Sequence, residues 1–345
     1  MKRVFIIILL ICLLVTGCKK TEEIKDEVND EVVVEPEEII EEKKVSIIDM
    51  ESNTRPYAVV INNYPSAAKV QSGLNEAYIV YEFPIEGGIT RSLALFKDKT
   101  DVKVGTIRSA RQNYIDYAME NDAIFVHFGW NVPAKEDIAE YKINYIDGNT
   151  RDNKAFKREK NGLATEHTVY SNLSTLISHN ENVRKFKTTT DVKPPLHYVT
   201  DIVDLSKYED SVVANNIKVN YASYNVEFKY NSETQRYDRY VKGKLHQDYF
   251  TKETYDTKNV LVINVGTNSI KEHVDAAGTN YLNIKNIGSG DGYYITNGYA
   301  RKIKWTKEAR DKQTVYKYDD GTVIDINDGN TYIMMKPTSQ SVKIN

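Results

Sequence analysis

The stretch Glu86–His127 carries most of the information about the fold, and it reads EGGITR at residues 86–91, GTIRSAR at 105–111 and FVH at 125–127. Val102–Ile107 and Ala123–Phe128 are apolar, strand-like runs. Between them, the sequence SARQ that starts at Ser109 matches a capping box, which predicts a helix ending near Asn121. Strand, helix and strand in this order predict a right-handed βαβ unit with parallel strands.

Two arginines and a histidine fall at the expected carboxyl edge of this unit. Arg108 follows the first strand and His127 lies near the end of the second, and open α/β sheets bind their ligands at that edge. Arg108 and Arg111 also flank the start of the helix, where the dipole disfavours cations and attracts anions. We therefore expect an anion site here. The alternative is that both arginines are exposed or pair with nearby carboxylates (Glu82, Glu86 or Asp116).

The candidate site residues fall into two chemical groups. The candidates for ligand binding are Asn63, Arg91, Arg108, Arg111 and Arg158. If the site is catalytic, the candidates for acid–base chemistry are Glu86, Asp116, His127 and His167. The spacing of these four matches no known metal-binding pattern, so we expect no metal and no cofactor. The chain also lacks a Gly-x-Ser-x-Gly elbow, a His-Glu-x-x-His motif and a P-loop, and no reaction class follows from it.

The N-terminus has the pattern of an export signal, which we place at residues 1–17. Two basic residues precede the apolar run Val4–Val15, which is too short for a comfortable transmembrane helix. The sequence VTGC that ends at Cys18 resembles a lipobox, which implies cleavage before Cys18 and its acylation, for example with palmitate. The alternative is an ordinary signal peptide or a short anchor helix. Cys12 is the other cysteine, so the mature chain has no disulfide and no cysteine nucleophile.

Residues 18–54 are interpreted as the lipidated cysteine followed by a disordered linker. Acidic residues far outnumber basic ones and no aromatic residue occurs, so the segment cannot bury enough apolar surface to order itself. We expect the folded part to be tethered to the extracytoplasmic face of the cell membrane. Beyond the linker the net charge is small and positive, and no basic patch with interleaved aromatics occurs, so nucleic acid is not an expected partner.

Two folded domains are expected after the linker. Residues 55–190 combine apolar strand-like runs with the βαβ unit, which predicts an α/β (α+β) domain with a mixed sheet. Residues 191–211 form a junction. Residues 212–340 are short alternating segments separated by glycine turns, which predicts a mainly antiparallel, β-rich domain. Within it, His246 and Asp248 form either an acid–base pair or a polar contact of a hairpin.

The order of the motifs resembles the DUF3048 family over essentially all of residues 55–340. The motifs that carry the resemblance are Arg55-Pro56, Asn63, Gln71–Leu74, Tyr81-Glu82, Glu86–Arg91, Ile107–Arg111, His127, His167, Tyr237-x-Arg239, Gly243-x-x-His246-x-Asp248, Gly288–Gly292 and Trp305. Thr106 and Gln112-Asn113 depart from the family pattern, which has Pro and Pro-Tyr there. The resemblance implies bacterial surface lipoproteins with an α/β first domain and a β-rich second domain, and it implies no activity.

Two functions are consistent with these features. The first is a binding or accessory protein of the cell envelope, with an anion- or glycan-facing site and a cell-wall polymer or another envelope protein as its partner. The second is a hydrolase or transferase acting on a wall polymer, with Glu, Asp and His as acid–base residues and arginines as anion clamps. The absence of a catalytic motif favours binding. The two share one requirement, which is that the candidate residues converge.

Overall fold

Seven consecutive buried residues, Tyr57–Asn63, form β1 in the N-terminal half of the fold. The structure is a computed structural model that describes residues 43–275 and 278–345. In it, β1 pairs antiparallel with β3 (Thr90–Phe96) and parallel with β5 (Ile124–His127). β3 also pairs antiparallel with β2 (Ile79–Pro84). The mixed sheet expected for this region is therefore confirmed.

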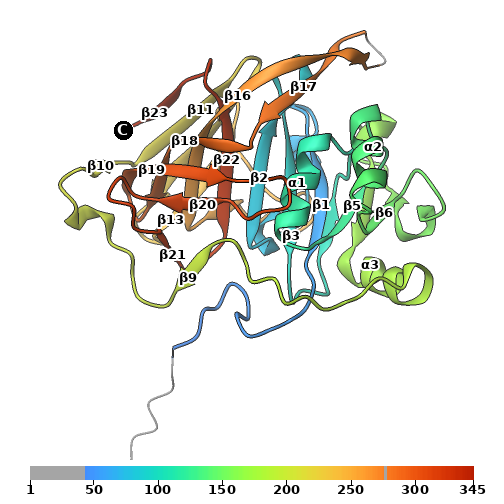
Figure 1. The fold of residues 1–345 in the computed structure, drawn as a ribbon, viewed down its shortest axis with the longest axis horizontal. Helices are drawn as coiled ribbons and strands as arrows, with labels where there is room; N and C mark the ends of the chain where they lie inside the picture. Colours follow the sequence, from blue (N-terminus) through green and yellow to red (C-terminus); the bar gives the residue numbers. More distant parts are fainter. Residues whose placement is uncertain (1–42, 276–277) are drawn as a thin grey trace, which may run out of the picture. The chain divides into compact units, whose positions relative to one another are not determined.

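These strands belong to one large sheet that runs through both halves of the chain (Figure 1). Its order is β10-β19-β18-β16-β22-β2-β3-β1-β5-β6, with β17 paired to β16 and β20 to β19. β22 lies between β16 and β2 and is parallel to both, so a strand from near the C-terminus joins the two halves. The remaining strands are β6 (Tyr145–Asp147), β10 (Val212–Val213), β16 (Asn259–Val274), β17 (Asn280–Lys285), β18 (Gly288–Thr296), β19 (Tyr299–Lys307), β20 (Val315–Lys317) and β22 (Thr331–Pro337).

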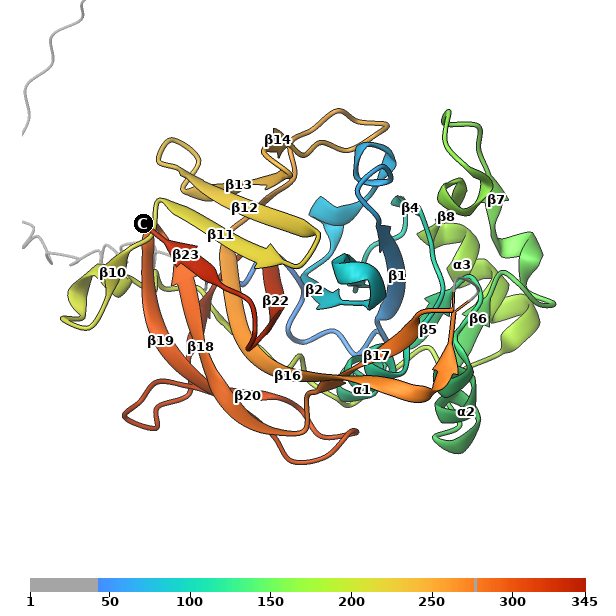
Figure 2. The ribbon, with the colours of Figure 1, turned by 90° about the horizontal axis from the view of Figure 1, so that it is seen from above.

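Smaller sheets and three α-helices flank the large sheet in the described part of the chain (Figure 2). One is mainly antiparallel and contains β11 (Asn216–Tyr221), β12 (Tyr224–Asn231), β13 (Arg236–Val241), β14 (Lys244–Leu245), β15 (Asp256–Thr257) and β23 (Val342–Ile344). The others are β4 (Lys103–Gly105) with β7 (Lys157–Arg158) and β8 (Val169–Asn172), and β9 (His197–Val199) with β21 (Asp325–Asn327). The helices are α1 (Gln112–Glu120), α2 (Val132–Glu140) and α3 (Leu173–His179). The β-rich second half is therefore confirmed.

Each face of the large sheet has its own hydrophobic core. Successive strand residues point to opposite faces, so Val60 of β1 contributes to one core and Val59 to the other. The first core includes residues of α1 and α2, such as Tyr114 and Ile138. The second includes α3 and the sheet that contains β11 and β12. Because both faces are covered, the central strands are apolar throughout rather than alternating.

The expected βαβ unit occurs one element later than predicted. Residues 103–105 form β4, but this strand pairs antiparallel with β8 in a separate sheet and does not pair with β5. The parallel neighbours of β5 are β1 and β6, and α2 connects β5 to β6. The prediction that strand 102–107 and strand 123–128 are parallel neighbours was therefore wrong. The hydrogen-bonding groups of β4 pair with β8 instead of β5.

The predicted capping box at Ser109 is absent. α1 begins after Arg111, which lacks a capping side-chain bond, and the Ser109 hydroxyl donates instead to the carbonyl of Phe128 at 3.1 Å. The amide of Gln112 donates to the carbonyl of Leu282 at 3.0 Å rather than back to the cap. Ser109 and Gln112 thus form hydrogen bonds to residues distant in sequence instead of the local bonds of a capping box. The predicted end of the helix near Asn121 agrees with the structure.

Residues at both ends of the first folded region pack more closely than a linker would. The amide groups of Ser46 and Ile47 donate to Asp328 at 2.8 and 3.0 Å, and Ile48 is buried. In residues 191–211, the side chains of Leu196 and Leu205 are buried in the first core. The described end of the segment 18–54 and the junction therefore both contribute to the packed fold. Residues 1–42, which include Cys18, lie outside the described residues.

Candidate functional site

The chain between β4 and α1 takes the place of β5 as the neighbour of β1 near the carboxyl end of that strand. The amide of Asn62 donates to the Thr106 carbonyl at 2.8 Å, and the amide of Arg108 donates to the Val60 carbonyl at 3.0 Å. The amide of Phe128, just beyond β5, donates to the Arg108 carbonyl at 3.0 Å. This packing fixes Arg108 at the carboxyl edge of β1 and β5.

Arg111 and Glu86 form a nearly buried ion pair at this edge. Arg111 Nε donates to both carboxylate oxygens of Glu86 at 3.1 and 3.3 Å, and Nη2 contacts Oε1. The guanidinium also lies 5.2 Å from the centre of the Tyr281 ring of β17. Burial alone would raise the pKa of Glu86, but the hydrogen bonds and charge of Arg111 outweigh it and hold that pKa below its ordinary value. Glu86 is therefore the ionised counter-ion of Arg111.

Arg91 of β3 lies beside this pair and has no counter-ion of its own in the described part of the chain. Its side chain is 6% exposed, its Nη1 donates to the Ser109 carbonyl at 2.7 Å, and its buried Nε has no hydrogen-bond partner among the described residues. Burial, followed by the positive charge of Arg111, lowers the pKa of Arg91. The environment of Arg91 thus disfavours its positive charge. A bound anion would lower the free-energy cost of burying that charge.

Arg108 completes a cluster of arginines with Arg91 and Arg111, which we call the arginine cluster. Burial lowers the pKa of Arg108; the charge of Glu166 opposes this shift and that of Arg111 adds to it. The Nε of Arg108 is buried and, within the described residues, unpartnered. The hydroxyl of Tyr114, which is fully buried and close enough to Arg91 and Arg111 to feel their charges, is also unpartnered there. The cluster therefore holds several unused donors.

His167 and Arg158 lie at the margin of the arginine cluster. Asn62 Nδ2 donates to His167 Nδ1 at 2.7 Å, and the imidazole stacks on the ring of Tyr64 with centroids 5.4 Å apart. Burial is the main cause that lowers the pKa of His167, and the charge of Arg108 contributes. Arg158 is exposed, donates to the Thr165 carbonyl at 2.5 Å and lies 4.9 Å from the centre of the Phe128 ring.

His127 and Asn63 are buried away from the surface of this site. His127 Nδ1 donates to the Gly129 carbonyl at 2.9 Å, and its ring packs against Trp130 and Tyr145. Burial lowers the pKa of His127 and outweighs the opposing charge of Asp147. The Asn63 amide donates to Glu82 at 2.9 Å and to Thr90 at 2.8 Å. Both residues therefore have interior partners in this structure.

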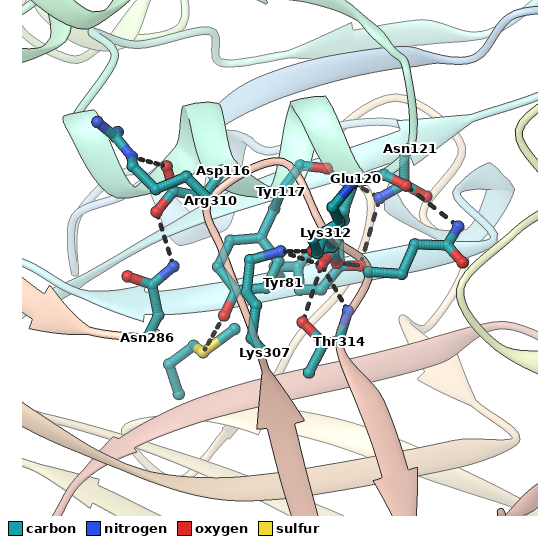
Figure 3. Close-up of polar contacts among 12 residues, drawn as sticks. Tyr81, Asp116, Tyr117, Glu120, Asn121, Asn286, Lys307, Arg310, Lys312 and Thr314 are labelled. Carbon is teal, nitrogen blue, oxygen red and sulfur yellow. Dashed lines mark hydrogen bonds and ion pairs between the residues drawn. The ribbon is translucent and has the colours of Figure 1, made fainter. Parts of the chain in front are cut away.

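Asp116 points to another part of the molecule (Figure 3). Its carboxylate accepts from Arg310 Nε at 2.6 Å and from Asn286 Nδ2 at 2.8 Å, and Arg310 also pairs with Asp137 at 2.6 Å. Burial raises the pKa of Asp116 to about 6, although the charge of Arg310 opposes this shift. The four acid–base candidates, Glu86, Asp116, His127 and His167, are thus not brought together as one set.

Two buried ion pairs were not predicted from the sequence. Lys307 Nζ lies 2.7 Å from Glu120 Oε2 with both side chains fully buried, and Tyr81 and Thr314 donate to the same carboxylate (Figure 3). The other pair joins Arg239 to Glu82. The alternation Ile303, Trp305, Lys307 along β19 is a usable signal, because it places Lys307 on the buried face. The pairing itself carries no such signal, because Glu120 and Glu82 lie far from Lys307 and Arg239 in the sequence.

The described residues offer neither a metal site nor a membrane-crossing helix. In residues 43–275 and 278–345, no three His, Cys, Asp or Glu side chains come together in a way that could hold a metal ion. No helix in this part of the chain combines the length and apolar character needed to cross a membrane.

The fold and the site define a protein whose two halves share one mixed sheet. Its N-terminal half carries a cluster of arginines in which Glu86 pairs with Arg111. Residues 45–189 match the family described as "Protein of unknown function (DUF3048) N-terminal domain", and residues 217–333 match the corresponding C-terminal domain. The chain therefore belongs to the DUF3048 family, as the ordered motifs had indicated.

Similarity to one curated protein and to one crystal structure extends over most of the chain. The sequence is 28% identical over 294 residues to a Bacillus subtilis (strain 168) protein named "Putative lipoprotein YerB", and the match covers 84% of this chain and 83% of that protein. The fold is similar to the crystal structure of YerB from Bacillus subtilis, with a TM-score of 0.72 and 26% identity. That match covers 88% of this chain and 100% of the other.

Proposed function

We propose that this protein binds an anionic component of the cell envelope through Arg91, Arg108 and Arg111. The observation that carries the proposal is the charge of the arginine cluster, where Glu86 pairs with Arg111 and the other two guanidiniums have no carboxylate partner among the described residues. A buried cation without a counter-ion is costly. An anion held between the guanidiniums would remove that cost and would occupy the unused donors.

The proposed location is the extracytoplasmic face of the membrane, with a lipid anchor on Cys18. The lipobox-like sequence that ends at Cys18 supports this, as does the name of the similar Bacillus subtilis protein. More than one acyl chain would give a stable anchor. The acidic segment that follows would tether the folded part near wall polymers and other envelope proteins, which are the proposed partners.

The placement of the acid–base candidates supports binding over hydrolysis or group transfer. A general acid or base must reach the reacting group within hydrogen-bond distance. The Glu86 carboxylate forms an ion pair with Arg111, and the Asp116 carboxylate forms an ion pair with Arg310 in another part of the molecule. His127 is fully buried against Tyr145. A role as a noncatalytic binding or accessory protein therefore has the stronger support.

The binding of inorganic phosphate to the full-length protein, purified in detergent, tests the proposal by titration calorimetry. Arg108→Ala is the main variant, because Arg108 is only half buried and its removal leaves the Arg111–Glu86 pair in place. Arg301→Ala is the matched control, since Arg301 of β19 pairs with Asp210. We expect Arg108→Ala to weaken binding at least tenfold and the control to leave it unchanged. Equal affinities of wild type and Arg108→Ala would overturn the proposal.

The anchor needs a separate test in cells. Replacing Cys18 by Ala should release the protein from the membrane fraction and abolish incorporation of an alkyne-labelled palmitate, if Cys18 carries the acyl chains. Cys12→Ala is the control, because the other cysteine lies inside the apolar run. Unchanged labelling of the Cys18→Ala variant would contradict the proposed anchor.

A further inference from the structure

A second cationic feature is a hollow of about 600 Å³ between residues 65–69 and the hairpin of β13 and β14. We call it the lysine hollow. Its size falls within the range of sites that hold small organic ligands. Its wall contains four lysines, and the lining residues are Pro65, Ser66, Ala68, Lys69, Val241, Lys242, Lys244, Leu245, His246, Gln247, Asp248 and Lys252.

The charge of the lysine hollow is not balanced by its own wall. Its one carboxylate, Asp248, accepts hydrogen bonds from the amides of Gly73 and Phe250 at 2.7 and 2.8 Å and from the Tyr255 hydroxyl at 3.0 Å. These neutral donors satisfy the carboxylate. Among the described residues, none of the four lysines forms an ion pair. Lys252 Nζ donates to the Tyr249 carbonyl at 2.5 Å, so Lys69, Lys242 and Lys244 supply the ammonium groups that are left for a ligand.

The wall of the hollow is held in place by contacts between the two halves of the chain. His246 Nε2 donates to the Ala68 carbonyl at 2.9 Å, and the Tyr249 amide donates to the Gln71 carbonyl at 2.8 Å. Lys242 and Gly243 have φ of 50° and 75°, the left-handed values of a tight two-residue hairpin turn. The hollow is therefore preformed, which lowers the entropy lost when a ligand binds.

The lysine hollow begins next to the margin of the arginine cluster. Pro65 lines the hollow, and the preceding residue, Tyr64, stacks on His167, whose imidazole is close enough to Arg108 to feel its charge. Seen from above, β14, which bears Lys244, and β17, which bears Tyr281, lie on opposite sides of β1 and β2 (Figure 2). The turn that follows β1 thus lines the lysine hollow and contacts the margin of the arginine cluster.

We propose that the lysine hollow is a second anion site and that, together with the arginine cluster, it binds a single linear polymer with repeating phosphate groups. This inference rests on the proposed function of the arginine cluster. The unused donors of Arg91, Arg108 and Tyr114 come from different elements, and guanidiniums bind phosphate oxygens through charge-assisted hydrogen bonds. A polymer that reaches both sites gains affinity because its second contact is intramolecular.

The dependence of affinity on chain length tests the inference. The full-length protein in detergent is titrated with inorganic phosphate, tripolyphosphate and long-chain polyphosphate at fixed ionic strength. The double variant Lys242→Ala/Lys244→Ala removes two exposed charges from the hollow, and Lys302→Ala/Lys317→Ala removes two exposed charges from β19 and β20 as the matched control. We expect the first to weaken long-chain binding at least tenfold while binding of inorganic phosphate to the arginine cluster is unchanged, and the control pair to have little effect.

The outcomes separate this inference from the proposed function. Equal effects of the two lysine pairs on long-chain binding would overturn the inference and leave the arginine site standing. The same holds if tripolyphosphate and long-chain polyphosphate bind equally tightly, because a two-part site requires a gain with length. If Arg108→Ala changes the affinity for neither phosphate nor polyphosphate, the proposed function itself fails.

Discussion

Arg239 and Glu82 are separated by 157 residues in the chain and form an ion pair that is sealed from solvent. Arg239 Nη2 lies 2.7 Å from Glu82 Oε2, and the two side chains are 1% and 0% exposed. The other oxygen of Glu82 accepts from Asn63 at 2.9 Å and Thr90 at 2.7 Å. Because β2 and β13 belong to different sheets, this pair connects the two family regions across the second core.

The first prediction is that Arg239→Met strongly destabilises the protein. The substitution leaves the Glu82 carboxylate buried without its cation, which typically costs about 3–5 kcal/mol. Urea unfolding of the full-length protein measures the loss. The control is Arg236→Met on the same strand, whose pair with Asp256 is partly exposed and should cost about 1 kcal/mol or less. Similar losses for the two variants would show that the buried pair has no special weight.

The second prediction concerns the pH dependence that His246 creates. Arg239 Nη1 donates to His246 Nδ1 at 2.5 Å, and Nε2 donates to the Ala68 carbonyl, so the ring is neutral with its proton on Nε2. Burial, followed by the charge of Arg239, holds the pKa of His246 well below its ordinary value of 6.5. The contribution to stability is therefore complete above about pH 6.5 and is lost as the pH falls towards the folded-state pKa.

Unfolding free energies measured from pH 5 to pH 8 test this sign. On acidification below pH 6.5 the unfolded state takes up a proton at His246 that the folded state refuses, which costs up to about 1.4 kcal/mol per pH unit. His246→Gln keeps polar atoms at the site and removes the titration, so its stability should fall less steeply with acid than that of wild type. If the unfolding free energies of wild type and His246→Gln fell in parallel with pH, His246 would not be the source of the pH dependence.

The strands could be predicted from the sequence, but their partners could not. The apolar runs of β1, β2 and β3 and the alternating segments of the second half are local signals that the structure reproduces. The choice of neighbours is a long-range property, and it caused the error at β4, whose three residues pair with β8 rather than with β5. The insertion of β22 between β16 and β2 left no trace in the local sequence.

The site could be predicted in part for a similar reason. Arg91, Arg108 and Arg111 lie on segments that are close in sequence, so one sheet edge brings them together. His127 lies at the end of β5, as expected, but strand alternation puts its side chain on the same face as Phe125, which belongs to the first core. This alternation of side chains can be read from the sequence. By contrast, the partner of Asp116, Arg310, lies 194 residues away and could not be inferred from spacing.

The third prediction concerns the buried pair of Lys307 and Glu120. Lys307→Met leaves a carboxylate that still accepts from Tyr81 and Thr314, but its cation is lost in a site without solvent. We expect a loss of about 3 kcal/mol or more in urea unfolding. Lys304→Met, three residues earlier on β19, is the control, because its pair with Asp319 is more than half exposed and should contribute little. A loss no larger than that of the control would contradict the prediction.

The last prediction is that Glu86→Gln strengthens anion binding at the arginine cluster. In the structure Glu86 accepts from Nε of Arg111 and contacts its Nη2, so its carboxylate is the counter-ion of that guanidinium. It therefore competes with any external anion for that guanidinium. Gln keeps the size and one acceptor oxygen but replaces the other oxygen by an NH2 donor and removes the negative charge. At these separations the charge is worth at least the roughly 1.4 kcal/mol that corresponds to a tenfold change in affinity.

Calorimetric titration with inorganic phosphate should accordingly show affinity about tenfold higher for Glu86→Gln than for wild type, with a steeper loss of binding as salt is added. Glu227→Gln serves as the control, since Glu227 on β12 pairs with Lys218 away from the arginine cluster. A purely structural role of Glu86 predicts the opposite result, because losing the counter-ion of Arg111 would disorder the cluster and weaken binding. Measuring the affinity and the unfolding free energy of the same variant distinguishes the two: tighter binding in a less stable protein identifies Glu86 as a competitor for the anion.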